Sequence, residues 1–371
     1  MKDSIIRYCV GIDVDKKTFK ASCVALQYSG QVIIKASKTF NNNEEGFKEL
    51  LQWKIKHCKE TDITSSFLME ATGVYHEHLA FFLHNEKLTV HVVLANKAKR
   101  YIQSLGVRTK NDKIDAQGLA TMGVQQCLDV WKPISQQFYS LRSITRQIEA
   151  LQCSKTAFSN QLEAATHSPF SDKLVITNLK SIIKTLDNKI LLLQKKVEEI
   201  IKQDPELDAK FKLFKNLKGF GIMTFAVIVA ETGGFELFKS QAQLVNYAGY
   251  DIVENSSGSK VGKTKISKKG NSHIRRIMHM SSLNMVKYKI PVLRNLYERI
   301  YEKKKIKMKG YVAIQRKLLC LTYTIWKTNK EFDLNYQNKE NISLEKEPKS
   351  SFGSGLQDLK KKAVLNQPVL H

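Results

Sequence analysis

The order of β-rich and helical segments in the N-terminal third constrains the fold of this chain more than any other feature of its sequence. Apolar, β-branched runs at residues 5–14, 19–26 and 31–36 are separated by short turns and predict three consecutive strands. Their short connections predict an antiparallel meander. Residues 45–58 then repeat apolar side chains at helical spacing, which predicts a helix packed on this meander.

Strands and helices alternate after the meander. Short strands at residues 67–69 and 89–94 flank a helix at residues 76–84, and a further helix that begins near residue 112 follows a basic loop. Three strands, helix, strand, helix, strand, helix is the order of elements in an RNase H-like fold. We therefore predict an α/β domain of this fold at residues 1–130.

Four carboxylates fall at positions that such a fold brings to one edge of its sheet. Asp13 lies in the first strand and Glu70 at the end of the fourth, while Asp112 and Asp115 lie three residues apart on one face of a later helix. Carboxylates this close repel one another unless a divalent cation binds, and two Mg²⁺ ions are the usual solution for in-line phosphoryl transfer. The four residues are candidate metal ligands and catalytic residues.

Each of these carboxylates also has a simpler interpretation. Asp112 and Asp115 could cap and stabilise the start of a helix, and Glu70 could be an ordinary charge at a strand end. A Gly-Ile-Asp strand end also occurs in actin-like ATPases and sugar kinases. That class needs a glycine-rich phosphate loop after Asp13, but Val14-Asp15-Lys16-Lys17 follows here.

Residues 131–205 predict a helical arm. Apolar side chains recur at helical spacing from Leu141 to Leu162, and a second series from Ile176 to Ile200 alternates steps of three and four. A repeat of about 3.5 residues is typical of a coiled coil. Ser168-Pro169 lies between the two series and predicts the turn of an antiparallel helical hairpin. The arm could pack within one subunit or pair two subunits.

Two features of residues 206–330, which we predict to be mostly helical, indicate contact with nucleic acid. Gly219 and Gly221 lie between two helical segments, as in a helix-hairpin-helix turn whose amides bind a DNA phosphate, although a plain tight turn fits equally well. A lysine-rich loop of serines and glycines precedes a helix predicted at residues 274–285. Residues 260–309 hold 16 Lys or Arg against two Glu, a net charge of +14. Candidate nucleic-acid contacts are Gly219, Gly221, Lys260, Lys263, Lys265, Lys268, Lys269, Asn271, Arg275 and Arg276.

Composition narrows the partners. The formal charge of +25 and the pI near 9.6 favour a polyanion, either nucleic acid or an anionic membrane. The longest apolar run, residues 222–230, is well short of the roughly 20 residues that span a bilayer, and the first residues do not read as a signal peptide. Six cysteines without a CxxC pair predict reduced, mostly buried thiols of a cytosolic protein, with no zinc site and no disulfide. The polar residues 331–371 predict a poorly ordered tail.

In combination these motifs resemble one family. From about residue 8 to about residue 330, the chain resembles the DEDD transposases of bacterial insertion sequences, which are bridge-RNA-guided serine recombinases with a RuvC-like domain before a transposase domain. The chain departs from the family's pattern at Lys218 and Ile252, where proline is usual, and both positions affect loop geometry. The motifs that carry the resemblance are, in order, GIDV, EATGVY, KNDKIDA, a helical arm, GFG, AGY, SSG and ISKKGNSHIRR.

The resemblance implies a function and partners. It assigns the family's acidic residues to Asp13, Glu70, Asp112 and Asp115, and its nucleophilic serine to Ser257, with Ser256 adjoining. It implies a recombinase that attacks phosphodiesters through this serine with Mg²⁺ and forms a covalent phosphoserine. It further implies donor DNA, target DNA and a bridge-type guide RNA as partners, a dimer through the arm, a tetramer on DNA, and action in the bacterial cytoplasm at the nucleoid.

Two other functions fit parts of the sequence. A RuvC-type junction endonuclease would use the same carboxylates with metal-activated water in place of Ser257. A non-catalytic nucleic-acid-binding protein would explain the basic charge but not the four carboxylates.

Overall fold

The chain divides into two compact units, which separate between Pro133 and Ile134. The structure, a computed structural model, describes residues 4–60, 62–71, 73–106, 111–254, 256–257, 260–262 and 264–333. Lys263 and most of the predicted tail therefore lie outside the described residues.

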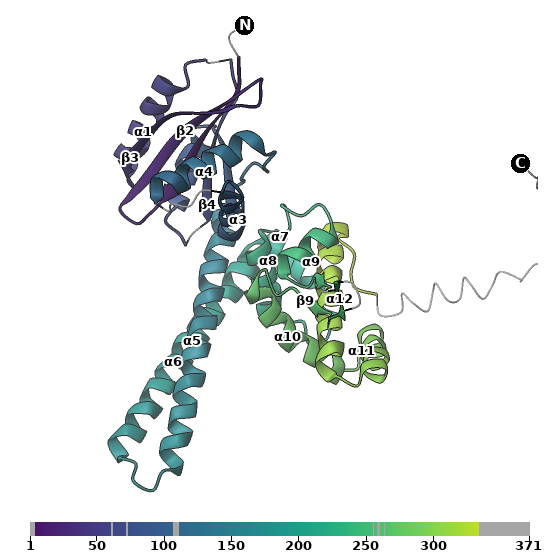
Figure 1. Cartoon of the computed structure of the whole chain (residues 1–371). Coiled ribbons are helices and arrows are strands. Elements are labelled where there is room, and N and C mark those ends of the chain that lie inside the picture. Colours follow the sequence, from purple (N-terminus) through teal and green to yellow (C-terminus); the bar gives the residue numbers. More distant parts are fainter. Residues whose placement is uncertain are drawn as a thin grey trace, which may run out of the picture. The chain divides into compact units, whose positions relative to one another are not determined.

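The first unit is an α/β domain in which three strands precede alternating helices and strands (Figure 1). Its elements are β1 (Ile5–Val14), β2 (Thr18–Gln27), β3 (Val32–Asn41), α1 (Glu44–His57), β4 (Ser65–Ala71), α2 (Glu77–Asn85), β5 (Thr89–Leu94), α3 (Ala95–Ser104) and α4 (Asp112–Gln125). The predicted α/β class and order of elements are confirmed. The predicted basic loop after β5 is wrong, because its first residues form α3.

One five-stranded sheet forms the centre of this unit, with the strand order β3-β2-β1-β4-β5. Strands β1, β2 and β3 are antiparallel neighbours, as the predicted meander requires, whereas β4 is parallel to both β1 and β5. Side chains alternate between the two faces of a strand, so the sheet has two apolar faces. Helices α1 and α2 cover the face of Val10 and Phe67, and helices α3 and α4 cover the face of Cys9 and Leu68.

Helix α4 lies unusually close to β1 because small residues meet at the contact. A Cβ atom on Gly11 would lie 2.1 Å from the backbone nitrogen of Ala120 and 2.3 Å from the backbone oxygen of Ala116. A Cβ atom on Gly123 would lie 2.2 Å from Sγ of Cys9. Both distances are far below van der Waals contact, so only glycine fits at positions 11 and 123.

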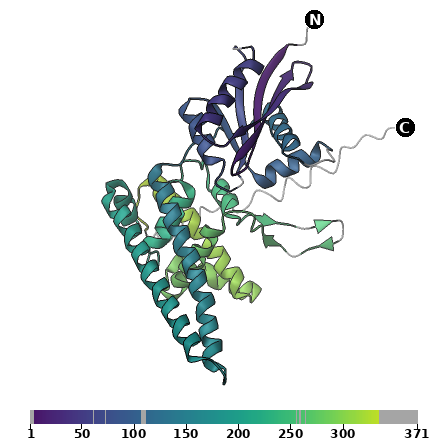
Figure 2. The ribbon, with the colours of Figure 1, turned by 90° about the vertical axis from the view of Figure 1, so that its left-hand side faces the viewer.

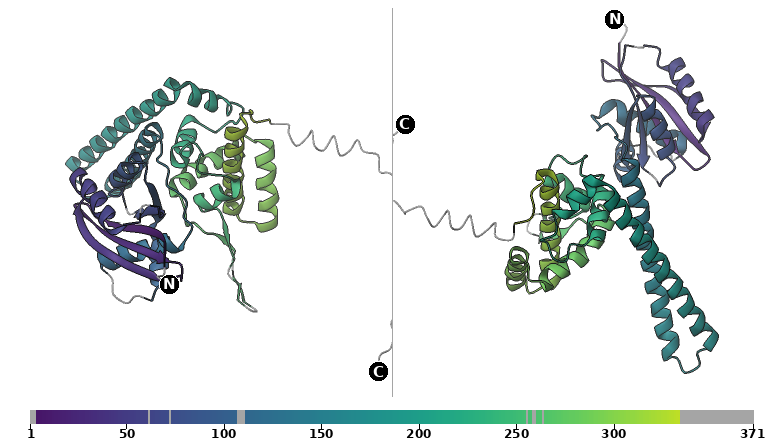
Figure 3. Two further views of the ribbon diagram at one scale, coloured as in Figure 1. Left: turned by 90° about the horizontal axis from the view of Figure 1, so that it is seen from above. Right: turned by 180° about the vertical axis from the view of Figure 1, so that it is seen from behind.

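The second unit is mostly helical, as predicted, and begins with two long antiparallel helices joined by a short turn (Figure 3). The turn lies at Ser168-Pro169, where it was predicted. The elements are α5 (Gln136–His167), α6 (Lys173–Gln203), α7 (Pro205–Lys212), α8 (Ile222–Thr232), α9 (Gln241–Ala248), β6 (Ile252–Val253), β7 (Ser256–Ser257), β8 (Lys260–Val261), β9 (Lys265–Ile266), α10 (Ser272–Lys287), α11 (Pro291–Lys304) and α12 (Lys307–Thr328).

The arm shares its core with the helices that follow it. Leu141 and Ile148 of α5 and Val197 of α6 belong to the same buried cluster as Phe225 of α8 and Leu318 of α12. The base of the arm is therefore fixed in this unit by burial of apolar side chains. A supercoil in the arm and the domain boundaries at residues 130, 205 and 330 stay predictions.

A β-ribbon replaces part of the predicted serine- and lysine-rich loop (Figure 2). Ile252 pairs with Ile266 in β6 and β9, and Ser257 pairs with Lys260 in β7 and β8. The loop prediction is wrong for these short strands, because backbone pairing holds them together in a segment that lacks an alternating apolar pattern.

Three further expectations concern cysteines and membranes. All six cysteines are free, as predicted, but Cys127 and Cys153 are exposed, so the prediction that the thiols are mostly buried is wrong for these two. Sγ of Cys23 lies 3.5 Å from Sγ of Cys58 in the core of the first unit. Among the described helices, none combines the length and the apolar character that a membrane span requires.

Candidate active site

Asp13 and Glu70 lie at the carboxyl ends of two adjacent parallel strands. Ile12 pairs with Met69 in the register of β1 and β4, and each carboxylate is the next residue of its strand. Side chains at every second position of a strand project from the same face. Asp13 therefore shares a face with Cys9 and Gly11, and Glu70 with Leu68, and this is the face that α3 and α4 cover. Both side chains are half-buried.

The start of α4 carries Asp112 and Asp115. The N-cap of this helix is Asn111, whose side chain accepts a hydrogen bond of 2.9 Å from the backbone N–H of Ile114. The capping interpretation of Asp112 is therefore wrong, because the preceding residue caps the helix. Both aspartates still lie in the first turn, where negative charge is favourable.

The direction of α4 brings its start toward the end of β1 that carries Asp13. Gly123 lies against Cys9, whereas Ala116 and Ala120 lie against Gly11, so the helix runs antiparallel to the strand. Asp13 lies two residues after Gly11 in β1, and Asp112 lies one helical turn before Ala116 in α4. The close contact at Gly11 thus aligns all four carboxylate positions with one edge and one face of the sheet.

The donor chemistry of this edge fits a hard divalent cation. Carboxylate oxygens are the ligands that Mg²⁺ prefers, and four of them offer enough negative charge for two ions. In the described part of the chain, no three His, Cys, Asp or Glu side chains already stand in a cluster that could hold a metal ion. The backbone thus sets the positions of the carboxylates, and their assignment as metal ligands stays a prediction.

Two polar residues at the same edge were not identified from the sequence. Nδ2 of Asn42 donates hydrogen bonds to the backbone oxygens of Asp15 (2.9 Å) and Tyr75 (3.2 Å), which joins the loops after β1 and β4. His76, at the end of the loop that follows Glu70, is 7% exposed. Its Nδ1 has no hydrogen-bond partner among the described residues. Burial lowers the pKa of His76 from 6.5, although the charge of Glu77 opposes this shift.

The predicted nucleophile Ser257 lies in the second unit, at the end of β7. Its backbone pairs with Lys260. At the base of the ribbon, backbone hydrogen bonds run from Ser267 to Asp251 (2.8 Å) and from Lys268 to Gly249, the C-cap of α9 (3.1 Å). The assignment of Ser257 over Ser256 stays a prediction.

Three of the predicted lysine contacts are exposed, whereas Arg275 is bonded within the protein. Lys265, Lys268 and Lys269 are exposed near the base of the ribbon, and Lys260 lies in β8. Arg275 is held within the unit, because its Nη1 donates to the backbone oxygens of Ala248 (2.8 Å), Gly270 (3.0 Å) and Asn271 (3.2 Å).

Arg276, Gly219 and Gly221 complete the predicted contacts. Nη1 of Arg276 donates to Oε1 of Glu149 and to Sγ of Cys153, each at 2.9 Å. Gly219 lies in the turn before α8 with a φ of +94°, and Gly221 is the N-cap of α8. As predicted, the two glycines connect two helices, α7 and α8.

A buried carboxylate fixes the base of the ribbon. The side chain of Glu231 on α8 is 1% exposed and accepts two hydrogen bonds from Arg146 on α5, at 2.7 and 2.9 Å. It also accepts a bond of 2.7 Å from Nδ2 of Asn271, whose Oδ1 caps α10. Burial alone would raise the pKa of Glu231, but the bonds from Arg146 and Asn271 outweigh it and hold the pKa below its usual range. Asn271 is thus engaged within the protein.

Two family models match the chain. Residues 10–169 match a family described as Transposase, and residues 211–298 match one described as Transposase IS116/IS110/IS902 family. The first match contains the four candidate carboxylates, and the second contains Ser257.

The chain is also similar to curated proteins and solved structures. The pilin gene-inverting proteins of Moraxella bovis and Moraxella lacunata are each 29% identical to it over 325 residues, which is 87% of this chain and 97% of either relative. A RuvC structure of Thermus thermophilus matches 32% of this chain and 93% of its own, with a TM-score of 0.26 and 9% identity. RuvC of the same organism in complex with a Holliday junction substrate matches 33% of this chain and 99% of its own, with a TM-score of 0.26 and 8% identity.

Proposed function

Since the chain carries two transposase domains, the second of the IS116/IS110/IS902 family, we propose that it cuts and exchanges DNA strands through serine attack on phosphodiesters. The pilin gene-inverting relatives support strand exchange over simple cutting, because an inversion must rejoin every strand that it breaks. A chain with a formal charge of +25 suits a DNA substrate.

The carboxylates of Asp13, Glu70, Asp112 and Asp115 hold divalent metal in this proposal. The observation that carries it is the contact of α4 with Gly11, which aligns these residues at one edge of the sheet. Mg²⁺, two ions in our proposal, would stabilise negative charge on the phosphate and activate the attacking oxygen. Asn42 joins the two loops of this edge and so limits the movement of Asp13 and Glu70 relative to each other.

Ser257 supplies the attacking atom. Its Oγ loses a proton and forms a bond to the phosphorus, while the bond from phosphorus to the 3′ oxygen breaks and that oxygen takes up a proton. The products are a phosphoserine and a free 3′ hydroxyl. Strand exchange reverses these steps with a different 3′ hydroxyl, so the number of phosphodiester bonds is conserved. The serine and the carboxylates come together on the scissile phosphate, as a composite site from different subunits.

Partners follow from the same proposal. The protein acts on donor and target DNA with a bridge-type guide RNA, in the bacterial cytoplasm at the nucleoid. The arm joins two subunits, and two dimers form a tetramer on DNA. Apolar side chains that are exposed near the turn and along α6 support pairing of the arm, because burial would remove them from water. They are Phe170, Leu174, Val175, Leu191 and Leu192.

The test is a trap for the covalent intermediate. A DNA junction that carries both ends of the element is incubated with the full chain, the guide RNA and Mg²⁺, then denatured and separated by size. We expect a protein–DNA adduct with the natural chain and with Ser256→Ala, and none with Ser257→Ala.

Two results would contradict the proposal. An adduct that persists in Ser257→Ala and disappears in Ser256→Ala would move the nucleophile by one residue. Cleavage at the natural rate by both variants, with no adduct, would indicate a RuvC-type endonuclease that uses water.

A further inference from the structure

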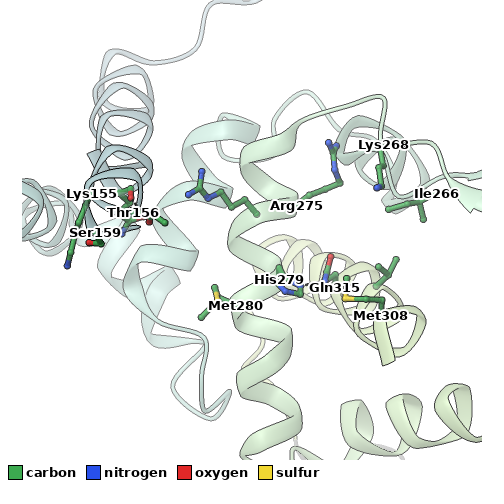
Figure 4. A pocket seen from close by; sticks show the side chains of 13 residues that line it. Lys155, Thr156, Ser159, Ile266, Lys268, Arg275, His279, Met280, Met308 and Gln315 are labelled. Carbon is green, nitrogen blue, oxygen red and sulfur yellow. Dashed lines mark hydrogen bonds between the residues drawn. The ribbon is translucent and has the colours of Figure 1, made fainter. Parts of the chain in front are cut away.

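A groove runs between the arm and the C-terminal helices of the second unit, beside the base of the β-ribbon. Its volume is 850 Å³, within the range of roughly 300–1,000 Å³ that is typical of ligand sites. Helix α5 forms one wall with Lys155, Thr156 and Ser159 (Figure 4). Side chains of α10 and α12, with Ile266 and Lys268 from the return strand of the ribbon, form the opposite side.

The charge of this groove is one-sided. Its lining includes Lys155, Lys268, Arg275 and Arg276, and no Asp or Glu among the described lining residues, although Arg276 is paired with Glu149. Lys155 is paired with Asp187 at 2.6 Å, but both side chains are well exposed, so this bond is weak. Arg275 also lines the groove, and its Nη1 is fixed by backbone oxygens of Ala248 and Gly270. A ligand of negative charge fits this lining.

Hydrogen-bond donors in the groove are held in fixed positions. Oε1 of Gln315 accepts a bond of 3.0 Å from the hydroxyl of Tyr250, so its amide nitrogen is left to donate to Nδ1 of His279 at 3.1 Å. This contact fixes the orientation of the His279 ring at the wall of the groove. The donors therefore need little reordering when a ligand binds.

Apolar side chains lie between these polar groups. Met280 is 58% exposed and Met308 is 52% exposed, although both are long apolar residues that gain from burial. Thioethers pack favourably against the flat face or the edge of an aromatic ring. The ligand that suits the groove combines negative charge with planar aromatic surface.

We propose that this groove binds an unpaired stretch of DNA strand, with its phosphates on the basic side chains and at least one base against Met280 and Met308. In a duplex the base faces are stacked inside and cannot reach the methionines, which favours unpaired nucleotides. An acidic peptide would satisfy the cations but not the apolar surface. This inference rests on the proposed function, since strand exchange separates the strands near the cut and leaves bases unpaired.

Two variants of α5 form a matched test. Thr156 and Ser154 are both exposed, and each hydroxyl donates to the backbone oxygen one turn earlier, at Gln152 (2.9 Å) and Ala150 (3.2 Å). Thr156 lines the groove and Ser154 does not. Thr156→Glu and Ser154→Glu therefore add the same charge to the same exposed helix, but only the first adds it inside the groove.

The experiment measures binding of a short single-stranded oligodeoxynucleotide with a central 2-aminopurine to the full chain. We expect Thr156→Glu to raise the Kd at least tenfold, about 1.4 kcal/mol, and Ser154→Glu to change it less than threefold. Met280→Ala should leave the Kd within a few-fold but reduce the change in 2-aminopurine fluorescence on binding. Equal Kd values for the two Glu variants would overturn the proposal.

Further arms separate this inference from the proposed function. An RNA oligonucleotide or polyglutamate that competes better than the DNA strand at the groove would identify a different ligand and overturn the proposal. Adduct formation on a prenicked junction reports the carboxylates and Ser257 alone. If the natural chain forms no adduct, the proposed function is wrong. If it forms the adduct but Thr156→Glu and Ser154→Glu bind the oligodeoxynucleotide equally well, only the inference about the groove is contradicted.

Discussion

Asp13 and Glu70 are neighbours across the sheet, each one residue beyond the Ile12–Met69 pair of two parallel strands. Side chains at equivalent positions of adjacent parallel strands project from the same face. Residues at every second position before them, Gly11 and Leu68, contact α4, which begins with Asp112. This relationship gives the four carboxylates a shared location without requiring that they touch one another in the absence of metal.

Removal of one of these charges should abolish chemistry and spare binding. We expect Asp13→Asn or Glu70→Gln to lower the rate of strand cleavage by about 10²–10³-fold, since one lost electrostatic partner of a reacting centre has effects of this size. Affinity for DNA should stay equal or increase, because a negative charge near the phosphate is removed. Cleavage of a labelled junction and a mobility-shift titration measure the two effects. Glu45→Gln, on α1 at the opposite face, should change neither.

The close contact at Gly11 should be sensitive to a single methyl group. Gly11→Ala forces a Cβ atom to within 2.1 Å of a backbone nitrogen of α4, so the helix must move away from β1. We expect a loss of about 1–3 kcal/mol in the free energy of unfolding of the first unit. Cleavage should fall further than stability accounts for, because the movement shifts Asp112 and Asp115. Denaturant unfolding and junction cleavage are measured on the same samples.

A second glycine provides the control for this variant. Gly30 has a φ of +85° and no neighbouring atom within 4 Å of a built Cβ. Gly30→Asn should cost about 1 kcal/mol or less, because asparagine tolerates this conformation and nothing obstructs it. Full cleavage activity in Gly11→Ala would contradict the role of this contact in aligning the carboxylates.

His76 should make the first unit less stable in mild acid. Burial lowers its pKa from 6.5, so the unfolded chain takes up a proton at a higher pH than the folded chain does. Above the unfolded pKa both states are neutral and this stability is fully present. It declines as the pH falls below 6.5 and stops declining once the pH has passed the folded pKa.

Hydrogen exchange of β1 and β4 between about pH 7 and pH 5 measures this effect, with rates corrected for their intrinsic pH dependence. In His76→Gln the decline should be smaller, because glutamine does not titrate. His78 is exposed in the first turn of α2, two residues after His76, and gives the matched variant His78→Gln, in which the natural decline should persist. The same pH profile in both variants would assign the acid sensitivity to other groups.

The sequence predicts the parts of this site that depend on periodic patterns. The two strands β1 and β5 run over the predicted residues, since continuous β-branched runs are required wherever both faces of a sheet are covered. The sequence also predicts the order of strands and helices, because each element has its own periodic pattern of apolar residues. That order is enough to bring Asp13 and Glu70 to one edge, because parallel neighbours align their carboxyl ends.

Features that depend on a single contact are not predicted. Helix α3 was missed because it is short and rich in Lys and Arg, and the apolar face that packs on the core consists only of Ala98, Tyr101 and Ile102. Capping of α4 by Asp112 was one interpretation of the sequence, but Asn111 is an equally good capping residue by type and takes that role. Asn42 and His76 carry no pattern at all, and only the folded loops after β1 and β4 identify them.

The ion pair between Arg146 and Glu231 should be important for the stability of the second unit. Glu231→Gln removes the charge from a carboxylate that is 1% exposed and weakens its two bonds to Arg146, so we expect a loss of about 3 kcal/mol. Glu199→Gln is the control, because the pair of Lys196 and Glu199 is 55% exposed on both sides and should contribute less than about 0.5 kcal/mol.

The contribution of Glu231 also has a defined pH dependence. Its pKa is lowered on folding from 4.5, so the stability from this group is fully present above the unfolded pKa and is lost as the pH falls through the folded pKa. Natural protein and Glu231→Gln should therefore approach each other in stability as the pH falls below 4.5. Urea unfolding followed through hydrogen exchange of α8 and α10 measures the stability of both proteins at each pH. If the two proteins differ by the same amount at pH 7 and pH 3, the pair does not carry the stability and packing around Glu231 does.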